Sequence, residues 1–143
     1  MQKSKVEIEE QEFETESISP ILNFGDIKEF QEFLMEHNKD IIVAKFYKDN
    51  CPFCVEYTPV FEELQKIFKK NIYFTNVNVN KDVRIKYSYR ITDLPTTLII
   101  KEGTPYYRRI GVIPYLEMED RLKKIENSLK KQKSVEATAF IKI

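Results

Sequence analysis

The sequence predicts an α/β fold in which a central mixed β-sheet carries helices on both faces. The first observation is an apolar run at residues 41–47, broken only by Lys45, which is typical of a buried central strand. The second is that strand-like runs alternate with segments of helical apolar spacing. The third is a turn signal, Glu102-Gly103-Thr104-Pro105, that joins the last two strands as a hairpin. A βαβ unit followed by a hairpin and a final helix implies a mixed sheet.

Each element has its own signal in the sequence. The first helix begins at Asp26, which forms a capping box with Glu29. The second helix has apolar residues along one face and contains Pro59, which we expect to kink it. The strand at residues 72–79 alternates apolar and polar side chains. The predicted order is strand 18–24, helix 26–37, strand 41–47, helix 51–68, strand 72–79, helix 82–89, strand 96–101, strand 106–112 and helix 115–131.

Charge is unevenly distributed between the two ends of the chain. Residues 1–20 hold six Glu against two Lys, and residues 121–143 hold seven Lys or Arg against two Glu. We therefore expect an acidic, mobile arm at residues 1–17, a domain at residues 18–131 and a C-terminal tail at residues 132–143. The tails are either solvated or electrostatic partner sites. The apolar end of the C-terminal tail predicts either an extra edge strand or a docking segment.

Composition excludes several classes of protein. The formal net charge is zero, so nothing global indicates binding to nucleic acid or to an anionic membrane. The chain contains no run of 18 apolar residues that would span a membrane. Its first 20 residues lack the apolar core of a signal peptide. From these observations we expect a soluble, cytoplasmic protein.

The only two cysteines form the motif Cys51-Pro52-Phe53-Cys54, directly after the predicted central strand. The motif lies on the exposed first turn of the following helix, where unpaired N–H groups and the helix dipole favour a thiolate over a thiol. The thiolate is the attacking species in disulfide exchange. Cys54 lies one helical turn from Cys51 and is within reach to resolve a mixed disulfide. The pattern therefore indicates redox chemistry.

We expect neither a metal nor a histidine base at this motif. Zinc takes about four ligands, and two cysteines with one distant histidine fall short within one chain. A dimer that shares four cysteines around zinc or an iron–sulfur cluster is the alternative. His37 is predicted at a helix end, far in sequence from the cysteines, although a Cys–His pair is conceivable.

Four further residues stand at fixed distances from the motif. Pro59 and Pro95 follow Cys54 by 5 and 41 residues, and Gly103 and Gly111 follow Pro95 by 8 and 16 residues. A Cys-x-x-Cys motif with these four residues resembles the thioredoxin family over about residues 18–131. The resemblance implies a thioredoxin-like fold and the activity of a thiol–disulfide oxidoreductase.

The resemblance also assigns a role to the loop Leu94-Pro95-Thr96. In the family, the proline at this place follows a cis peptide bond and faces the cysteines, so a cis Leu94–Pro95 bond is expected here. The neighbouring backbone would pair with an extended substrate strand. Leu94, Pro95 and Thr96 are thus candidate substrate-binding residues. The alternative for Pro95 is an ordinary turn before a strand.

The residues around the cysteines depart from the family pattern. Asn50 precedes Cys51 where the family usually has Trp, although Tyr47 stands where the family places an aromatic residue. Pro52-Phe53 replaces the Gly-Pro of thioredoxins and makes the motif similar to that of glutaredoxins. The Gly-Gly-Asp pattern of glutaredoxins is missing, so glutathione specificity is not expected. We expect Pro52, Phe53 and Tyr47 to tune the thiolate pKa and the contact surface.

Lys45 is the third departure. It stands six residues before Cys51, where the family usually has a buried Asp or Glu that relays a proton to the resolving cysteine. A lysine cannot copy that role at neutral pH unless burial lowers its pKa by several units. The hypothesis is that its charge stabilises the Cys54 thiolate and makes the protein more oxidising. In the alternative, Lys45 reaches the surface or pairs with a carboxylate.

The sequence therefore predicts a thiol–disulfide oxidoreductase that reduces or exchanges disulfides in protein substrates. Cys51 would be the nucleophile and Cys54 the resolving cysteine. No bound cofactor is expected, because the electrons reside in the cysteine pair, and a reductase partner would recycle the protein if it works as a reductant. The alternative is a binding or assembly module of the same fold whose tails engage a protein partner.

Overall fold

The computed structural model describes residues 20–142, with side chains described for residues 20–131. Five strands form one sheet in the order β1-β3-β2-β4-β5. The elements are β1 (Leu22–Phe24), α2 (Ile27–Glu36), β2 (Ile41–Tyr47), α3 (Pro52–Phe68), β3 (Ile72–Asn78), α4 (Val83–Ser88), β4 (Thr96–Lys101), β5 (Thr104–Ile110) and α5 (Tyr115–Lys142). The acidic arm predicted at residues 1–17 lies outside the described residues, and the domain boundaries at 18 and 131 remain predictions.

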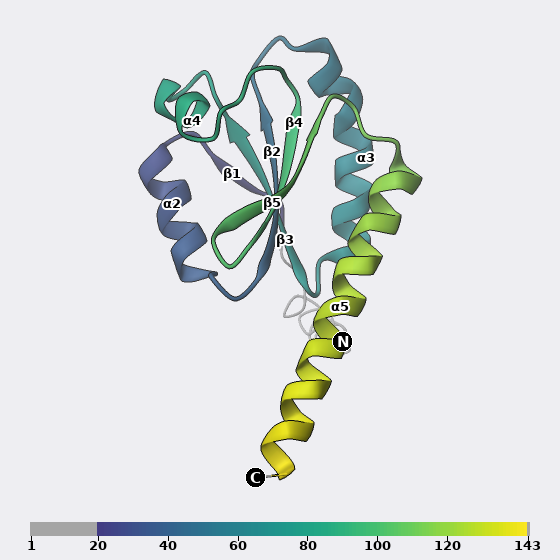
Figure 1. Cartoon of the computed structure of the whole chain (residues 1–143). Helices are drawn as coiled ribbons and strands as arrows, with labels where there is room; N and C mark the ends of the chain where they lie inside the picture. The colour runs from purple at the N-terminus through teal and green to yellow at the C-terminus, as the bar shows by residue number, and fades with distance from the viewer. Residues whose placement is uncertain (1–19, 143) are drawn as a thin grey trace, which may run out of the picture.

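The sheet is mixed and has two helices on each face. β1, β3 and β2 are parallel, whereas β4 runs antiparallel to β2 and β5 runs antiparallel to β4. Figure 1 shows α2 and α4 on one side of the sheet and α3 and α5 on the other. Each side has its own apolar cluster, the first including Phe30 and Phe46 and the second including Phe61 and Leu64. The predicted fold class is confirmed.

β2 is the most buried strand and directs the chain toward the cysteines. All its residues from Ile41 to Phe46 are buried, because β3 and β4 flank it and helices cover both faces. Alternate side chains enter the two clusters, with Val43 on the α3 side and Ala44 on the α2 side. The carboxyl end of β2 is therefore fixed in position where the Cys51-Pro52-Phe53-Cys54 turn begins.

The predicted boundaries of both edge strands were wrong, and the predicted strand 106–112 ends at Ile110. β1 begins at Leu22 within the described residues, later than the predicted residue 18. The β4–β5 turn has only two residues, Glu102 and Gly103, both at positive φ (55° and 74°). This is the conformation that matches the twist of a tight hairpin, and it lets β5 begin at Thr104 instead of Tyr106. Pro105 is tolerated because β5 is an edge strand.

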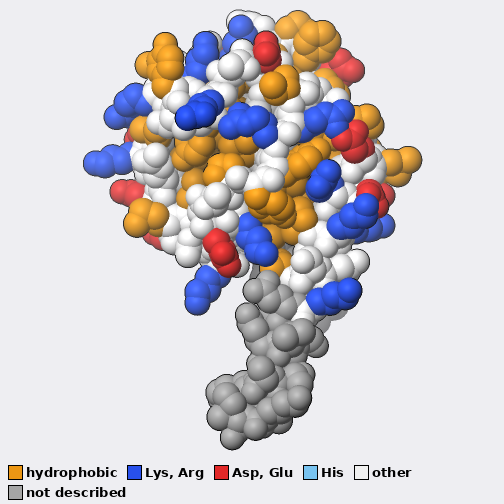
Figure 2. All heavy atoms as spheres, viewed as in Figure 1, with side chains coloured by type: hydrophobic (Ala, Val, Ile, Leu, Met, Phe, Trp, Pro, Cys, Tyr) orange, Lys and Arg blue, Asp and Glu red, His pale blue; other side chains and the backbone are white. Residues whose placement is uncertain are grey.

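β5 forms the edge of the sheet nearest the viewer in Figure 1. Figure 2 shows apolar side chains gathered across the middle of this face, bordered by Lys and Arg side chains. Tyr106 and Ile110 of β5 are among the exposed large apolar residues.

α5 extends beyond its predicted end at Lys131 and continues to Lys142. The interpretation of the C-terminal residues as an extra edge strand is therefore wrong, because their backbone is helical. Among the described residues, no helix, α5 included, is long and apolar enough to cross a membrane.

Asp82 ties the starts of two helices together. Its carboxylate accepts a hydrogen bond from the backbone N–H of Ile27, the first residue of α2, at 2.8 Å. It also caps α4 by accepting from the backbone N–H of Arg84, and it pairs with the Arg84 guanidinium through Nε and Nη2, each at 2.8 Å. The Arg84 side chain, followed by the Ile27 N–H, holds the pKa of the Asp82 carboxyl well below its usual range.

We expect Asp82→Asn to lower stability at neutral pH and to flatten its acid dependence. Because the pKa of Asp82 is depressed in the folded state, its contribution is complete above the unfolded-state pKa of about 4 and is lost as the pH falls toward the folded value. Urea titrations of both proteins between pH 7 and pH 2 measure this difference. Identical pH profiles for Asp82→Asn and the native chain would contradict the assignment.

Candidate active site

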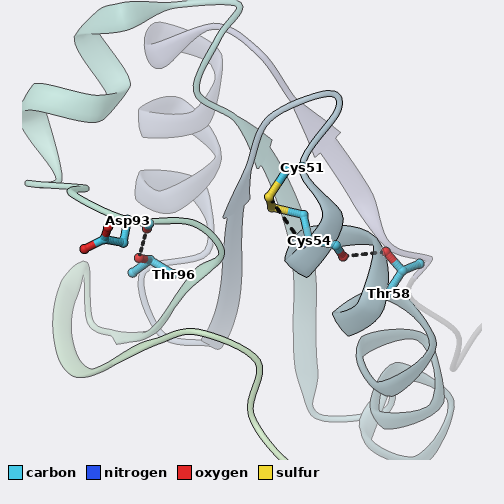
Figure 3. The surroundings of a disulfide bond; sticks show 5 residues. All are labelled: Cys51, Cys54, Thr58, Asp93 and Thr96. Atoms are coloured by element: carbon cyan, nitrogen blue, oxygen red, sulfur yellow. Dashed lines mark hydrogen bonds between the residues drawn. A yellow bond between two sulfur atoms is a disulfide. The ribbon is translucent and has the colours of Figure 1, made fainter.

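The turn between β2 and α3 delivers both cysteines to the start of α3. β2 ends at Tyr47, and Asn50 adopts a left-handed conformation (φ 58°) that turns the chain into the helix. Asparagine tolerates this conformation better than most side chains. Cys51 is the N-cap of α3 and forms a disulfide with Cys54, with their Cα atoms 5.2 Å apart. Figure 3 shows the disulfide on the first turn of the helix.

The helix start supplies one hydrogen-bond donor to the Cys51 sulfur and one to its carbonyl group. The backbone N–H of Cys54 donates to Cys51 Sγ at 3.3 Å, and the N–H of Val55 donates to the Cys51 carbonyl at 3.0 Å. Pro52 occupies the first helical position, where no N–H partner is needed. A thiolate at Cys51 would gain from the same donor and from the helix dipole, which lowers a thiol pKa at this place.

The disulfide itself is largely covered, but its surroundings are open. Cys51 is 6% exposed and Cys54 is 4% exposed, so the expectation that Cys51 lies exposed is wrong for this oxidised state. Phe53, between them, is 62% exposed, and Pro52 is exposed as well. An attacking partner therefore meets the Pro52-Phe53 surface before it reaches sulfur.

The loop before β4 faces the cysteine pair. The Leu94–Pro95 bond is cis, as expected. The Thr96 hydroxyl donates to the Asp93 carbonyl at 2.6 Å, and the Pro95 carbonyl accepts from the Gly111 N–H at 2.8 Å. Figure 3 shows Asp93 and Thr96 across from the disulfide. Within the described part of the chain, no hydrogen bond engages the backbone of Leu94. Its N–H and C=O groups therefore have no hydrogen-bond partner among the described residues.

Lys45 lies behind the disulfide and is only 4% exposed. Its Nζ is 4.7 Å from the ring centroid of Phe61, 5.8 Å from that of Tyr57 and 6.0 Å from that of Tyr47, within the range of cation–π contacts. No ion pair engages Lys45 among the described side chains. The alternatives in which it reaches the surface or pairs with a carboxylate are therefore wrong.

Burial shifts the charge state of Lys45. Desolvation lowers its pKa from 10.5 to about 8, and the more distant charge of Glu62 partly opposes that shift. Lys45 is thus still largely protonated at pH 7, although its pKa is lower than that of an ordinary lysine. At pH 7 the ammonium group is therefore present, as the hypothesis that its charge stabilises the Cys54 thiolate requires.

A pocket of about 290 Å³ brings Lys45 and Cys54 together. Asn76 also lines it and is the direct neighbour of Lys45 across the β2–β3 pairing. The Asn76 Oδ1 atom is buried without a hydrogen-bond partner among the described residues. The sequence analysis missed Asn76, because the alternation in β3 indicated only an ordinary polar face.

A second pocket, which we call the Cys51 groove, opens on the other side of the turn. It measures about 400 Å³ and is lined by Lys48, Asn50, Cys51, Lys86, Thr92 and Asp93, among others. The two lysines come from the β2–α3 turn and from α4. The sequence analysis did not identify either lysine. Lys86 is 35 residues from Cys51, and only the fold brings it close.

His37 lies away from the cysteines. It follows α2 as its C-cap, packs between the rings of Phe33 and Tyr73, and pairs with Asp40 at 3.0 Å. It precedes the start of β2, whereas the cysteines follow its end, so the strand separates them by about 20 Å. The expectation of a helix-end residue is confirmed, and a Cys–His pair is excluded.

The sequence matches the family model for thioredoxin over residues 24–131. The chain belongs to the thioredoxin family. The thioredoxin of Mycoplasmoides gallisepticum is 34% identical over 90 residues, which cover 63% of this chain and 88% of that protein. The thioredoxin of Chlorobaculum thiosulfatiphilum is 30% identical over 87 residues, covering 61% and 80% respectively.

Solved thioredoxin structures share the same architecture. The crystal structure of Schistosoma mansoni thioredoxin superposes with a TM-score of 0.67 at 27% identity, covering 76% of this chain and 97% of that one. Membership of the thioredoxin family, together with the adjacent cysteine pair, makes this chain a thiol–disulfide oxidoreductase.

Proposed function

We propose that this thioredoxin-family protein reduces or exchanges disulfides in protein substrates, with Cys51 as the nucleophile. The observation that carries the proposal is the arrangement of the Cys51–Cys54 disulfide at the start of α3, opposite a loop with a free backbone at Leu94. The two cysteines form a redox pair that the helix start activates. The loop at Leu94 provides a place where an extended substrate can bind.

The reaction proceeds in two exchanges. In the reduced protein, the Cys51 thiolate attacks one sulfur of the substrate disulfide, forms a Cys51–substrate disulfide and releases the other substrate sulfur as a thiolate. The Cys54 thiolate then attacks Cys51 Sγ, forms the Cys51–Cys54 disulfide and releases the second substrate thiolate. Two electrons pass from the dithiol to the substrate, and the released thiolates take protons from water.

Leu94, Pro95 and Thr96 hold the substrate in this proposal. The Leu94 N–H and C=O groups would pair with an extended substrate strand in the manner of β-augmentation. Pro95 and Thr96 are buried and fixed, Pro95 through Gly111 and Thr96 through Asp93, so the loop is preorganised. A rigid binding element loses little conformational entropy when it binds.

The neighbouring side chains tune the cysteine pair. Pro52 and the exposed ring of Phe53 form the surface that a substrate meets. Lys45, with Tyr47 close to its ammonium group, supplies positive charge behind Cys54. This charge favours the Cys54 thiolate and hence the reduced protein, which makes the pair more oxidising.

Turnover as a reductant requires a partner that reduces the Cys51–Cys54 disulfide. A compartment that keeps thiols reduced, such as the cytoplasm, suits this cycle. We keep one alternative, in which the fold is a binding or assembly module and its terminal segments engage a protein partner. The unequal charge of the two ends of the sequence favours it.

Trapping with Cys54→Ser distinguishes the two functions. We expect the variant to attack a disulfide-containing peptide through Cys51 and to stop there, because the resolving sulfur is missing. Mass spectrometry under non-reducing conditions should find one half of the peptide attached at Cys51 and released by dithiothreitol. The matched control is the double variant Cys51→Ser/Cys54→Ser. A Cys54→Ser protein that captures no more peptide than this control indicates the binding module.

A further inference from the structure

The Cys51 groove is basic on one side of the disulfide. Lys48 and Lys86 line it, and Asp93 is the carboxylate that lines it with them. Neither lysine has an ion-pair partner among the described side chains, although ion pairs occupy Arg84, Arg109, Lys123 and Lys124 elsewhere. The carboxylate of Asp93 is engaged by the Thr92 hydroxyl at 3.3 Å. The groove therefore offers two free ammonium groups against one carboxylate.

The polar groups between the lysines are suited to a carboxylate ligand. Asn50, next to Cys51, and Asn80, two residues after β3, also line the groove and carry side-chain amide groups. A carboxylate accepts hydrogen bonds only, and ammonium and amide N–H groups donate them. The volume of about 400 Å³ lies within the range of small-ligand pockets and is ample for one or two side chains of a substrate.

Two exposed apolar side chains stand near the site but outside the lining of the Cys51 groove. Phe53 is 62% exposed, and Ile110, which pairs with Thr96 beside the Pro95 loop, is 49% exposed. A segment that places its cysteine at Cys51 therefore has both lysines and exposed apolar side chains near the site.

We propose that the Cys51 groove makes the protein select disulfides in protein segments that carry an acidic side chain close to the attacked cysteine. Lys48 and Lys86 bind that side chain, and Phe53 and Ile110 accept an apolar residue on the other side of the substrate cysteine. This proposal rests on the proposed function, because it names the substrate class of the same site. Lys48 also lines the pocket of Lys45 and Cys54, so its charge acts on both sides of the turn.

The expected preference is moderate and depends on salt. Exposed ion pairs contribute little each, and two of them correspond to roughly a three- to tenfold faster reaction with an acidic segment at low ionic strength. Such charges act mainly on the association rate. Because the Debye length falls to about 3 Å in 1 M salt, most of the preference should disappear there.

The experiment compares six disulfide peptides that differ only beside the reactive cysteine. One neighbouring position holds Glu, Gln or Lys and the other holds an apolar residue, and each of these three peptides is made in both orders. Stopped-flow or quenched-flow kinetics give the second-order rate constant with the reduced full-length protein at 20 mM and 1 M salt. The same ratios are measured for Lys48→Gln, Lys86→Gln and the double variant. Lys66→Gln, an exposed lysine of α3 outside the groove, is the matched control.

We expect the Glu peptide to react faster than the Gln peptide, and the Lys peptide to react more slowly, in one of the two orders. The double variant should lose this ratio, whereas Lys66→Gln should keep it. Equal rates for all peptides, or a ratio that survives in the double variant, would overturn the selectivity while leaving the proposed function intact. If even the Gln peptide is not attacked by the native protein, the proposed function itself fails.

Discussion

Replacing Cys51 with serine is expected to lower disulfide reduction by at least about a thousandfold, whereas the fold should be preserved. Removal of a catalytic nucleophile typically has effects of this size or larger. A hydroxyl stays protonated in the field of the helix start and cannot form the mixed disulfide. The measurement is the rate of peptide disulfide reduction with dithiothreitol as the recycling reductant, corrected for the uncatalysed rate.

The Cys54→Ser variant shows which cysteine attacks the substrate. Both variants lack the internal disulfide, so both should differ similarly from the oxidised native protein in stability. Only Cys54→Ser should still consume one equivalent of substrate disulfide. If Cys51→Ser captures substrate through Cys54, the roles of the two cysteines are reversed. Circular dichroism and thermal unfolding of each variant separate lost chemistry from lost structure.

Replacing Lys45 with methionine is expected to make the Cys51–Cys54 pair more reducing. At pH 7 the buried ammonium stabilises the Cys54 thiolate and hence the reduced protein, and methionine keeps the packing without the charge. A tenfold change in the equilibrium corresponds to about 30 mV, so we expect a shift on the order of 10–30 mV toward negative potential. Equilibration in glutathione buffers, followed by trapping of free thiols, gives the potentials.

The pH dependence of this shift identifies its cause. Because the pKa of Lys45 is about 8, its charge is lost as the pH rises through that value, and the potentials of native protein and variant should converge above about pH 9. Lys66→Met, at an exposed position on α3, should match the native potential throughout. A Lys45→Met potential equal to that of the native protein at pH 7 would contradict the tuning role.

Lys45 should also make the stability of the folded protein depend on pH. Its folded-state pKa of about 8 lies below the unfolded value of about 10.4, so between these values the unfolded chain binds more protons. Stability from this group therefore rises with pH across that window, and the full cost of the buried charge is present below pH 8. Lys45→Met should be more stable than the native protein at pH 7, with the difference narrowing toward pH 10.

The sequence predicted the features of the site that are local. The position of Cys51 and Cys54 on the first turn of α3 follows from the apolar run before them and the helical spacing after them. Pro95 was found only through its distance from Cys54, because a proline before a strand has no local signal for facing a cysteine. The burial of Lys45 follows from its place within an apolar strand. The sequence does not show that its ammonium group lies over the ring of Phe61.

The features that the sequence did not predict depend on contacts between segments that are distant in the chain. Lys86 reaches the Cys51 groove only because α4 packs at the end of the sheet, and Asn76 meets Lys45 only through the register of β2 and β3. The hairpin turn was misplaced because Thr104 and Pro105 are typical turn residues, whereas the positive φ angles fall at Glu102 and Gly103. An edge strand accepts a proline there, and a sequence pattern does not show which strand lies at the edge.

The contact between Gly111 and Pro95 has a consequence for incomplete chains. The cysteine pair is made by four consecutive residues, but the loop that faces it is held by a residue 16 positions further along the chain. A chain cut before Gly111 would keep the Cys51-Pro52-Phe53-Cys54 motif and would lose the hydrogen bond that holds the Pro95 carbonyl. The reactive residues and the residue that supports the facing loop are therefore encoded in separate segments of the chain, and only the complete fold combines them.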